Sequence, residues 1–436
     1  MTRKMKDSGI EWIGEIPEDW RVMSLKHSLK GLRTGINPRD NFQLGEGNNF
    51  YVTIKNFKDG KLFLDEKCDR ITDDALEIIN KRADLKVNDI LFSSISDEGH
   101  IFLIKEKPKN WTINESVFSI RPNKKIIHPI FLAYILPKNY IFTELKSKET
   151  GSTFKSIKQD HLKDSKIVVP NMNEQRYISQ FLDKKTEQIE NIKSKIVQEI
   201  QTLENYKKSI ITEAVTRGLD KNVEMKDSGI EWIGEIPKHW EITYLKKFFY
   251  EGKNKNKFGQ EKNLLSLSYG KIINKDINTQ EGLLPKNFNN YNIVEKESIV
   301  IRPTDLQNDK RSLRTGYVNE KGIITSAYIN LKPKKNINSK YFHYLLHSYD
   351  LMKVFYNMGS GVRQGLTYSE FSKLLVLNPN KIEQEQTIAY LDKKTAIIDE
   401  AITSKQKQLG ILEEYKKSLI YEYVTGKKEV GDVGTI

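Results

Sequence analysis

The stretch MKDSGIEWIGEIPEDW at residues 5–20 returns almost unchanged as MKDSGIEWIGEIPKHW at residues 225–240. The two copies are identical at 14 of 16 positions. A near-verbatim repeat at this distance indicates an internal duplication, and a duplication constrains the architecture more than any single motif does. We refer to these two stretches as the opening motifs.

A second repeated segment follows each opening motif. Residues 181–216 match residues 390–425 without a gap, at 16 of 36 positions. Both copies contain LDKKT (182–186 and 391–395) and YKKS (206–209 and 415–418), and GSTFK (151–155) has a looser counterpart in GSGVR (359–363). The chain is therefore a head followed by a helical segment, written twice.

Both long repeated segments have the pattern of coiled-coil helices. Apolar residues recur at or near steps of seven, and proline is absent: Leu182, Ile189, Ile196, Leu203 and Ile210, with Ile192 and Tyr206 between them, then Leu391, Ile398, Ile402, Leu409, Leu412 and Leu419. A helix of about 40 residues is roughly 60 Å long, longer than a head is wide. We expect the two helices to pair antiparallel. The alternative is two unrelated amphipathic helices, each lying on its own head.

The heads differ in sequence but share a skeleton. VNDILFSS (87–94) corresponds to EKESIVIRP (295–303), and SVFSIRP (116–122) to SAYINLKP (326–333), all of strand length. An aromatic helical stretch follows in each head, FLAYIL (131–136) and YFHYLL (341–346). We predict an α+β fold with a pseudo-two-fold internal repeat. Its parts are a first head at 1–170, a central helical spacer at 171–218, a second head at 219–379 and a C-terminal helical spacer at 380–436.

Composition favours a nucleic-acid partner. The formal net charge is +13 and the sequence pI is near 9.2, so an acidic partner is expected. No apolar run reaches the roughly 18–20 residues of a membrane span, and the first residues lack a signal-peptide core. A single cysteine, Cys68, fits a reducing compartment. We expect a cytoplasmic protein that binds no membrane.

The search for catalytic motifs is negative. The sequence has no G-x-x-x-x-G-K-[ST] phosphate loop, no G-x-G-x-x-G and no Asn/Asp-Pro-Pro-aromatic motif; Asn378-Pro379-Asn380 is the nearest string to the last. His343 and His347 have a metal-ligand spacing, but Tyr344 stands where a zincin has its glutamate. We favour two partly buried histidines over a metal site, and we predict no catalytic residues and no metal.

The best candidates for reading DNA lie in the second head. Base edges are read by planar donors and acceptors, and IRPTDLQNDKRSLRTG (301–316) collects them after a strand-like run. The candidates in this loop are Arg302, Gln307, Asn308, Arg311 and Arg314. The corresponding loop of the first head, SSISDEGH (93–100), is shorter and acidic, with Ser94 and Ser96 as its candidates. The alternative is a solvated polar loop in each head.

A second pair of candidates lies just ahead of the shared helices. GSTFKSIK (151–158) and GSGVRQGL (359–366) combine glycine, small residues and cations, which suits phosphate or groove contacts. The candidate residues are Lys155, Lys158, Arg363 and Gln364. A plain turn is the competing interpretation. Exposed aromatic rings can stack on DNA, but for Tyr51, Phe57 and Tyr269 we expect core packing instead.

The arrangement resembles the specificity subunit of type I restriction-modification systems. The resemblance rests on DSGIEWIGEIPxxW in both copies, on Pro170…Glu174-Gln175 and Pro379…Glu385-Gln386, and on the LDKKT…YKKS helices. It implies two target-recognition domains that read the halves of a split, asymmetric DNA site, with two helices setting their spacing. It also implies two modification (methyltransferase) subunits and restriction (endonuclease/translocase) subunits as partners. S-adenosylmethionine, ATP and Mg are expected on those subunits, and no cofactor on this chain.

The resemblance does not transfer base contacts, because members of that family differ most within their recognition domains. Trp12, Trp232 and the outer faces of the helices are candidates for binding partner subunits. Burial in each head's own core is the competing explanation for both tryptophans. Two other functions remain open from the sequence: a self-contained nuclease or methyltransferase with an unrecognised site, and a coiled-coil scaffold that binds no DNA.

Overall fold

The computed structural model describes residues 3–39, 41–58, 60–94, 100–136, 157–278, 287–304, 306, 313–358 and 365–430. It divides into two compact units. The first unit is Met1–Ser194 with Leu409–Ile436, and the second is Lys195–Gln408. Each unit therefore holds one head together with parts of both long helices, whereas the sequence predicted the helices as segments of their own.

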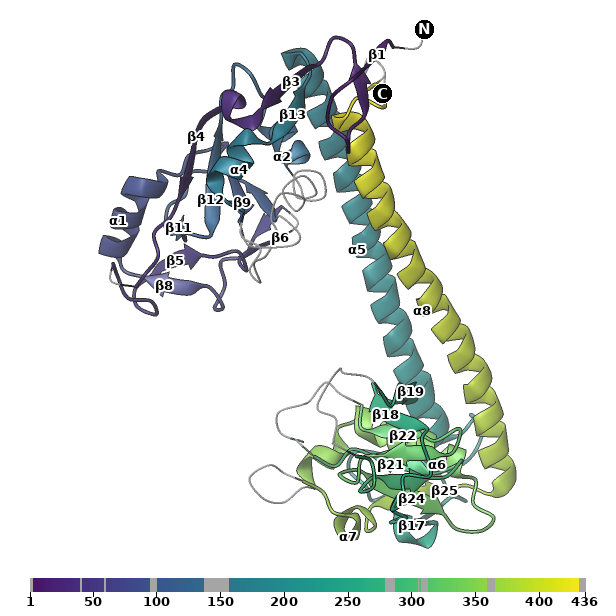
Figure 1. The fold of residues 1–436 in the computed structure, drawn as a ribbon. Helices are drawn as coiled ribbons and strands as arrows, with labels where there is room; N and C mark the ends of the chain where they lie inside the picture. Colours follow the sequence, from purple (N-terminus) through teal and green to yellow (C-terminus); the bar gives the residue numbers. More distant parts are fainter. Residues whose placement is uncertain are drawn as a thin grey trace. The chain divides into compact units, whose positions relative to one another are not determined.

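The first unit is built on a four-stranded antiparallel sheet in the order β10-β9-β12-β4, and a second sheet of order β11-β5-β8 contains a parallel pair (Figure 1). Its strands are β1 (Met5–Asp7), β2 (Glu15–Pro17), β3 (Arg21–Ser24), β4 (Leu29–Thr34), β5 (Asn49–Val52), β6 (Phe57–Lys58), β7 (Lys61–Leu62), β8 (Asp69–Ile71), β9 (Ile90–Ser93), β10 (Ile101–Leu103), β11 (Trp111–Ile113), β12 (Val117–Pro122) and β13 (Lys166–Val169). Its short helices are η1 (Leu25–Ser28), α1 (Asp73–Ala83), α2 (Pro129–Ile135) and α4 (Gln159–Asp164).

The second unit repeats this plan. Its first sheet has the order β17-β24-β21-β22, and its second sheet, of order β19-β18-β23-β20, again contains one parallel pair. Its strands are β14 (Met225–Asp227), β15 (Glu235–Pro237), β16 (Glu241–Tyr244), β17 (Phe249–Glu251), β18 (Leu264–Ser268), β19 (Lys271–Lys275), β20 (Asn292–Val294), β21 (Ile299–Ile301), β22 (Thr315–Tyr317), β23 (Gly322–Ile324), β24 (Ile329–Pro333) and β25 (Leu375–Asn378). Its short helices are η2 (Leu245–Lys247), α6 (Ser339–Leu351), η3 (Val354–Asn357) and α7 (Tyr368–Phe371).

The predicted correspondence between the heads is confirmed at the level of elements. Strands β9 and β21 occupy equivalent places in the two first sheets, as do β12 and β24. The opening motifs form hairpins of identical register, with Lys6 opposite Ile16 and Lys226 opposite Ile236. Each head is then closed by an antiparallel pair, β3 with β13 and β16 with β25, that leads into a long helix. The repeat is therefore structural as well as sequential.

The long helices α5 (Met172–Arg217) and α8 (Lys381–Val424) begin and end as their sequences indicate. Asn171 and Asn380 cap them, because each side-chain oxygen accepts the backbone N–H three residues on, at 3.0 Å. Gly218 follows α5 and Gly426 lies two residues beyond α8, with φ of +78° and +73°, a region that favours glycine at helix ends. None of the helices in the described part of the chain is long and apolar enough to cross a membrane.

Within each unit the two long helices pair antiparallel, as predicted. Ion pairs across them fall in a steady order, so that the α8 partner moves toward the N-terminus as the α5 residue moves toward the C-terminus. In the first unit they are Glu190–Lys416 and Lys193–Glu413, and in the second Glu199–Lys405 and Lys207–Asp399.

The apolar residues at steps of seven supply the buried contacts of the helix pair. Leu182, Ile189 and Leu419 belong to the core of the first unit, and Leu391 to that of the second. Two residues of the expected stripe lie outside it: Ile192 and Tyr206 are 48% and 50% exposed, because they fall between the steps of seven.

Candidate nucleic-acid interface

The two candidate DNA-reading segments of each head meet in the structure. In the first head the backbone N–H of Ile157 donates to the carbonyl of Ser94 at 2.8 Å. In the second head the backbone N–H of Leu366 donates to the carbonyl of Pro303 at 2.9 Å. The sequence nominated these segments separately, so their meeting at the same place in both heads strengthens the case for one interface per head.

Arg314 does not belong to that interface, which corrects the prediction. Its side chain is fully buried, and Nη1 donates to the carbonyl of Thr304 at 2.6 Å. Nε donates to the hydroxyl of Tyr356 at 3.3 Å, and the guanidinium lies over that ring. A buried cation satisfied by protein acceptors holds the base of the loop in place and has no surface to offer to DNA.

A buried carboxylate completes this anchor. The backbone N–H of Arg314 donates to the Asp350 carboxylate. Burial raises the pKa of Asp350 to about 6, although the Arg314 hydrogen bond and nearby cations oppose the shift. The base of the loop is thus fixed to helix α6.

Ser94 is a second correction. Its hydroxyl donates to the carbonyl of Ser116 at 2.7 Å, its backbone N–H donates to the same atom at 3.0 Å, and the residue is 3% exposed. A serine satisfied inside the protein joins strand ends and does not read bases.

Two of the candidate residues remain at the surface. Lys158 is exposed at the start of α4, and Arg302 is half-buried where β21 ends. Seven candidates lie outside the described residues and remain predictions: Ser96, Lys155, Gln307, Asn308, Arg311, Arg363 and Gln364.

The aromatic residues divide differently from the prediction. Tyr51 and Phe57 are core residues, at 2% and 0% exposure, as expected. Tyr269 was expected in the core as well, but it is 83% exposed in the turn between β18 and β19. The dipeptide Tyr269-Gly270 was the available signal, because glycine beside a strand pattern marks a turn.

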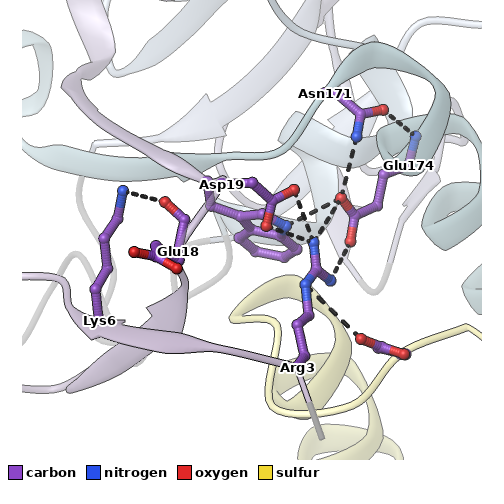
Figure 2. Close-up of polar contacts among 8 residues, drawn as sticks. Arg3, Lys6, Glu18, Asp19, Asn171 and Glu174 are labelled. Atoms are coloured by element: carbon purple, nitrogen blue, oxygen red, sulfur yellow. Dashed lines mark hydrogen bonds and ion pairs between the residues drawn. The ribbon is translucent and has the colours of Figure 1, made fainter. Parts of the chain in front are cut away.

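Each head is joined to its long helix through a tryptophan of the opening motif. The indole Nε1 of Trp20 donates to Glu174 Oε2 at 3.0 Å, and Trp20 is fully buried. Arg3 donates to the same carboxylate at 2.6 Å and to Asp19 at 2.9 Å, and its Nε lies 3.7 Å from Glu429 (Figure 2). The hydrogen bond to Glu174 raises the pKa of the Arg3 guanidinium, and the hydrogen bond to Asp19 adds to this rise although burial opposes it. The N-terminal and C-terminal segments of the chain are thereby tied to the start of α5.

The second copy repeats this junction with weaker bonds. Trp240 Nε1 donates to Glu383 at 3.4 Å, and His239 lies 2.8 Å from the same carboxylate oxygen. The glutamine after each glutamate is buried and donates to a proline carbonyl, Gln175 to Pro170 at 2.9 Å and Gln384 to Pro379 at 3.0 Å. The counterpart of Glu174-Gln175 is therefore Glu383-Gln384, and the alignment with Glu385-Gln386 was wrong.

The two candidate partner-binding tryptophans differ in environment. Trp12 packs against the core of the first unit, and its carbonyl accepts the hydroxyl of Tyr421 at 3.2 Å. Trp232 is 41% exposed and meets Tyr349 edge-on, with ring centroids 6.4 Å apart. Core packing thus accounts for Trp12, while Trp232 keeps an open surface.

His343 and His347 lie one turn apart inside the second unit, with ring centroids 6.0 Å apart. Burial lowers the pKa of His343 to about 3 and that of His347 to about 4, so both are neutral at pH 7. Among the described residues no group of three or more His, Cys, Asp or Glu side chains is placed to hold a metal ion.

The fold and the site define a class of protein in which a head and a helix are duplicated and each head carries one candidate loop interface. Comparison with known proteins agrees. Residues 17–202 match the family model described as the type I restriction modification DNA specificity domain.

Relatives match over almost the whole chain. The putative type I restriction enzyme MjaX specificity subunit of Methanocaldococcus jannaschii is 28% identical over 432 residues, covering 96% of each chain. The MjaIX specificity subunit of the same organism is 24% identical, covering 97% of this chain and 96% of its own. A solved chain from work on complex assembly and conformational transition of the type I R-M system has a TM-score of 0.70 at 14% identity, covering 95% of this chain and 99% of its own. That last likeness shows the fold.

The chain is similar to type I restriction enzyme specificity subunits over almost its whole length, and residues 17–202 match the DNA specificity domain of that family.

Proposed function

We propose that the chain is the DNA sequence-specificity subunit of a type I restriction-modification complex and reads a bipartite, asymmetric site. One observation carries the proposal: the frame of the heads is repeated, from the opening hairpins to the sheet order, while the loops on that frame differ. Equivalent frames present their loops in equivalent ways, and different loops read different bases. The two half-sites are therefore different sequences.

The antiparallel helices supply the symmetry that a split site needs. An antiparallel pair carries a two-fold axis perpendicular to the helices, and duplex DNA has two-fold axes of its own. Each head then meets its half-site in an equivalent orientation, on opposite strands. The helix length sets the gap between the half-sites.

Catalysis is assigned to partners. Two modification subunits supply methyl transfer with S-adenosylmethionine, and restriction subunits supply ATP- and Mg-dependent cleavage, while this chain is non-catalytic and binds double-stranded DNA. Support for this division comes from the lack of catalytic motifs in the sequence and from the names of the relatives. The alternative, a self-contained nuclease or methyltransferase, predicts turnover by the purified chain with DNA and Mg or S-adenosylmethionine.

Methylome sequencing of cells with and without this gene tests the proposal, because it reports the modified motif directly. We expect one split motif with two unlike halves. A chimera sharpens the test: residues 241–378, bounded by β16 and β25, are replaced by residues 21–169, bounded by β3 and β13. The chimera should modify two inverted copies of a single half-site. A continuous motif in the wild type, or an unchanged motif in the chimera, contradicts the proposal.

A further inference from the structure

The turn between β18 and β19 carries an aromatic residue in an unusual backbone conformation. Ser268 pairs with Lys271, so Tyr269 and Gly270 form a two-residue turn, with φ of +46° and +78°. Such turns select Asn, Asp or Gly, because a side chain at positive φ is strained. The Tyr269 ring is 83% exposed and so gains little packing in return. Backbone strain at an exposed residue, without packing that compensates it, indicates a functional role for that residue.

This turn lies against the base of the candidate DNA-reading loop. A Cβ placed on Gly270 would meet Leu313 at 3.1 Å and His347 at 3.3 Å, so the turn packs on the segment that enters β22 and on helix α6. Leu313 directly precedes Arg314, whose side chain holds the loop base at Thr304. The turn that carries Tyr269 therefore packs against Leu313, a residue of the 301–316 segment nominated for the second half-site.

The charge around the turn suits a polyanion. Lys271, next to the turn, and Lys207 of α5 both contact one carboxylate, Asp399, at 3.3 Å and 2.7 Å. Two cations sharing one anion leave one positive charge in excess in this cluster, and Lys271 lies two residues from Tyr269 in the sequence. An aromatic ring flanked by cations is a recurrent combination for contacts with nucleic acid.

A second exposed aromatic residue in the same head shows what is particular to Tyr269. Phe258 is also 83% exposed, but its φ is not positive. It lies in the turn that closes with the hydrogen bond from the Gly259 N–H to the Asn256 carbonyl, and a Cβ on Gly259 would meet Asn289 at 3.5 Å. Phe258 is thus equally exposed but lacks the strained backbone.

The first head has a hairpin of its own between β6 and β7, where Lys58 pairs with Lys61 and Gly60 has φ of +73°, but the residue before that glycine in the sequence is Asp59 and not an aromatic residue. Its matching strand, β5, leads into a tight turn in which Asn56 accepts from the backbone and hydroxyl of Thr53. The strained tyrosine is therefore a property of one head, as expected of a residue that serves one half-site.

We propose that Tyr269 is an aromatic DNA contact of the second head, with its ring packed against sugars and base edges of the second half-site. The inference rests on the proposed function. Aromatic side chains contact DNA by stacking or wedging at base steps, and the phenol hydroxyl adds a donor for a phosphate. A contact with DNA then explains why the Tyr269 ring is exposed in the chain without DNA.

The experiment measures DNA binding by the full chain in complex with its modification subunits. The duplexes carry the intact motif, or the motif with one half scrambled. Tyr269→Gly relieves the strain at positive φ, so the fold should be as stable as wild type or more so, by thermal unfolding. We expect affinity for the intact motif to fall about tenfold, or about 1.4 kcal/mol. Tyr269→Phe should keep most of the wild-type affinity, and Phe258→Ala should bind the intact motif as tightly as wild type.

The loss of affinity in Tyr269→Gly should come from the second half of the site alone. With the second half scrambled, wild type and Tyr269→Gly should bind equally; with the first half scrambled, the variant should still be weaker. Affinity of Tyr269→Gly and Tyr269→Ala within twofold of wild type on the intact motif overturns the inference. If the wild-type complex shows no preference for a split motif, the proposed function fails instead, so the two failures are distinguishable.

Discussion

The indole Nε1 of Trp20 donates a hydrogen bond to Oε2 of Glu174 across 3.0 Å, which fixes the first opening motif to the first turn of helix α5. The same pairing recurs between Trp240 and Glu383 at 3.4 Å. The backbone N–H of each glutamate also donates to the side-chain oxygen of the capping asparagine three residues earlier, Asn171 or Asn380. The most similar parts of the repeat are thus the parts that join a head to its helix.

Removal of the two glutamates should have unequal effects. Glu174→Ala leaves Trp20 and Arg3 without their acceptor and should lower the free energy of unfolding of the first unit by about 2 kcal/mol. Glu383→Ala, with longer bonds and an exposed His239 as the second partner, should cost about 1 kcal/mol. Urea titration of both variants measures this, with Glu385→Ala as the control. A larger loss of unfolding free energy for Glu385→Ala than for Glu383→Ala would show that Glu385 is the counterpart of Glu174.

Arg302 and Arg314 should separate specificity from stability. Arg302→Ala should relax base preference in the second half-site only, by about 1–3 kcal/mol if its contact is bidentate. Arg314→Ala should instead destabilise the second unit by about 3 kcal/mol, because it removes the buried side chain that donates to the Thr304 carbonyl and to the Tyr356 hydroxyl. Methylome sequencing and thermal unfolding of both variants provide the two readouts. A folded, stable Arg314→Ala with altered specificity would restore that residue to the interface.

Local patterns in the sequence predicted the frame well and the site only in part. Apolar steps of seven and the duplicated motifs predicted α5, α8 and the matching sheets, since both signals are carried by neighbouring residues. The alignment error arose because Glu383-Gln384 is followed by a second Glu-Gln pair. The spacing of four residues from Pro170 to Glu174 and from Pro379 to Glu383 already favoured the first pair, and the cap geometry agrees with it.

The errors at the site have a different cause. The burial of Arg314 depends on Thr304, Asp350 and Tyr356, partners that folding brings together from distant segments. The exposure of Tyr269 depends on where a strand ends, which an alternating pattern does not specify. Side-chain surroundings of this kind are tertiary properties, so residue type and position in the sequence were insufficient to predict them.

The second unit should lose stability in mild acid. The pKa values of His343 and His347 in the fold, about 3 and 4, lie below their ordinary 6.5, so their contribution is present above pH 6.5 and lost as pH falls toward 4. Asp350 acts oppositely: its pKa is raised from 3.8 to about 6, so its contribution is present below pH 3.8 and lost as pH rises through 6. Between pH 7 and pH 4 each histidine lowers the free energy of unfolding by roughly 3 kcal/mol and the aspartate raises it by roughly 2 kcal/mol, so the net change is a loss of a few kcal/mol.

Urea titrations between pH 7 and pH 4 check this balance. His343→Phe keeps an aromatic ring beside Tyr317 but cannot be protonated, so its unfolding free energy should fall less over that interval than that of wild type. His27→Asn, at an exposed position of the first unit, serves as the control. An equal fall in His343→Phe and wild type would show that the buried histidines do not govern the acid response.

Matched insertions in the long helices should lengthen the gap in the DNA site. Seven residues inserted between Ile196 and Leu203, with seven more between Ile402 and Leu409, keep the apolar steps and leave the ion pairs on either side in register. Seven helical residues add about 10 Å, which is about three base pairs at 3.4 Å each. Methylome sequencing should therefore show both half-sites unchanged and their gap about three base pairs longer. An insertion in α5 alone shifts Lys207 away from Asp399 and should weaken the helix pairing instead of giving an orderly change of gap. If the matched insertion leaves the gap constant, the helices do not set the spacing.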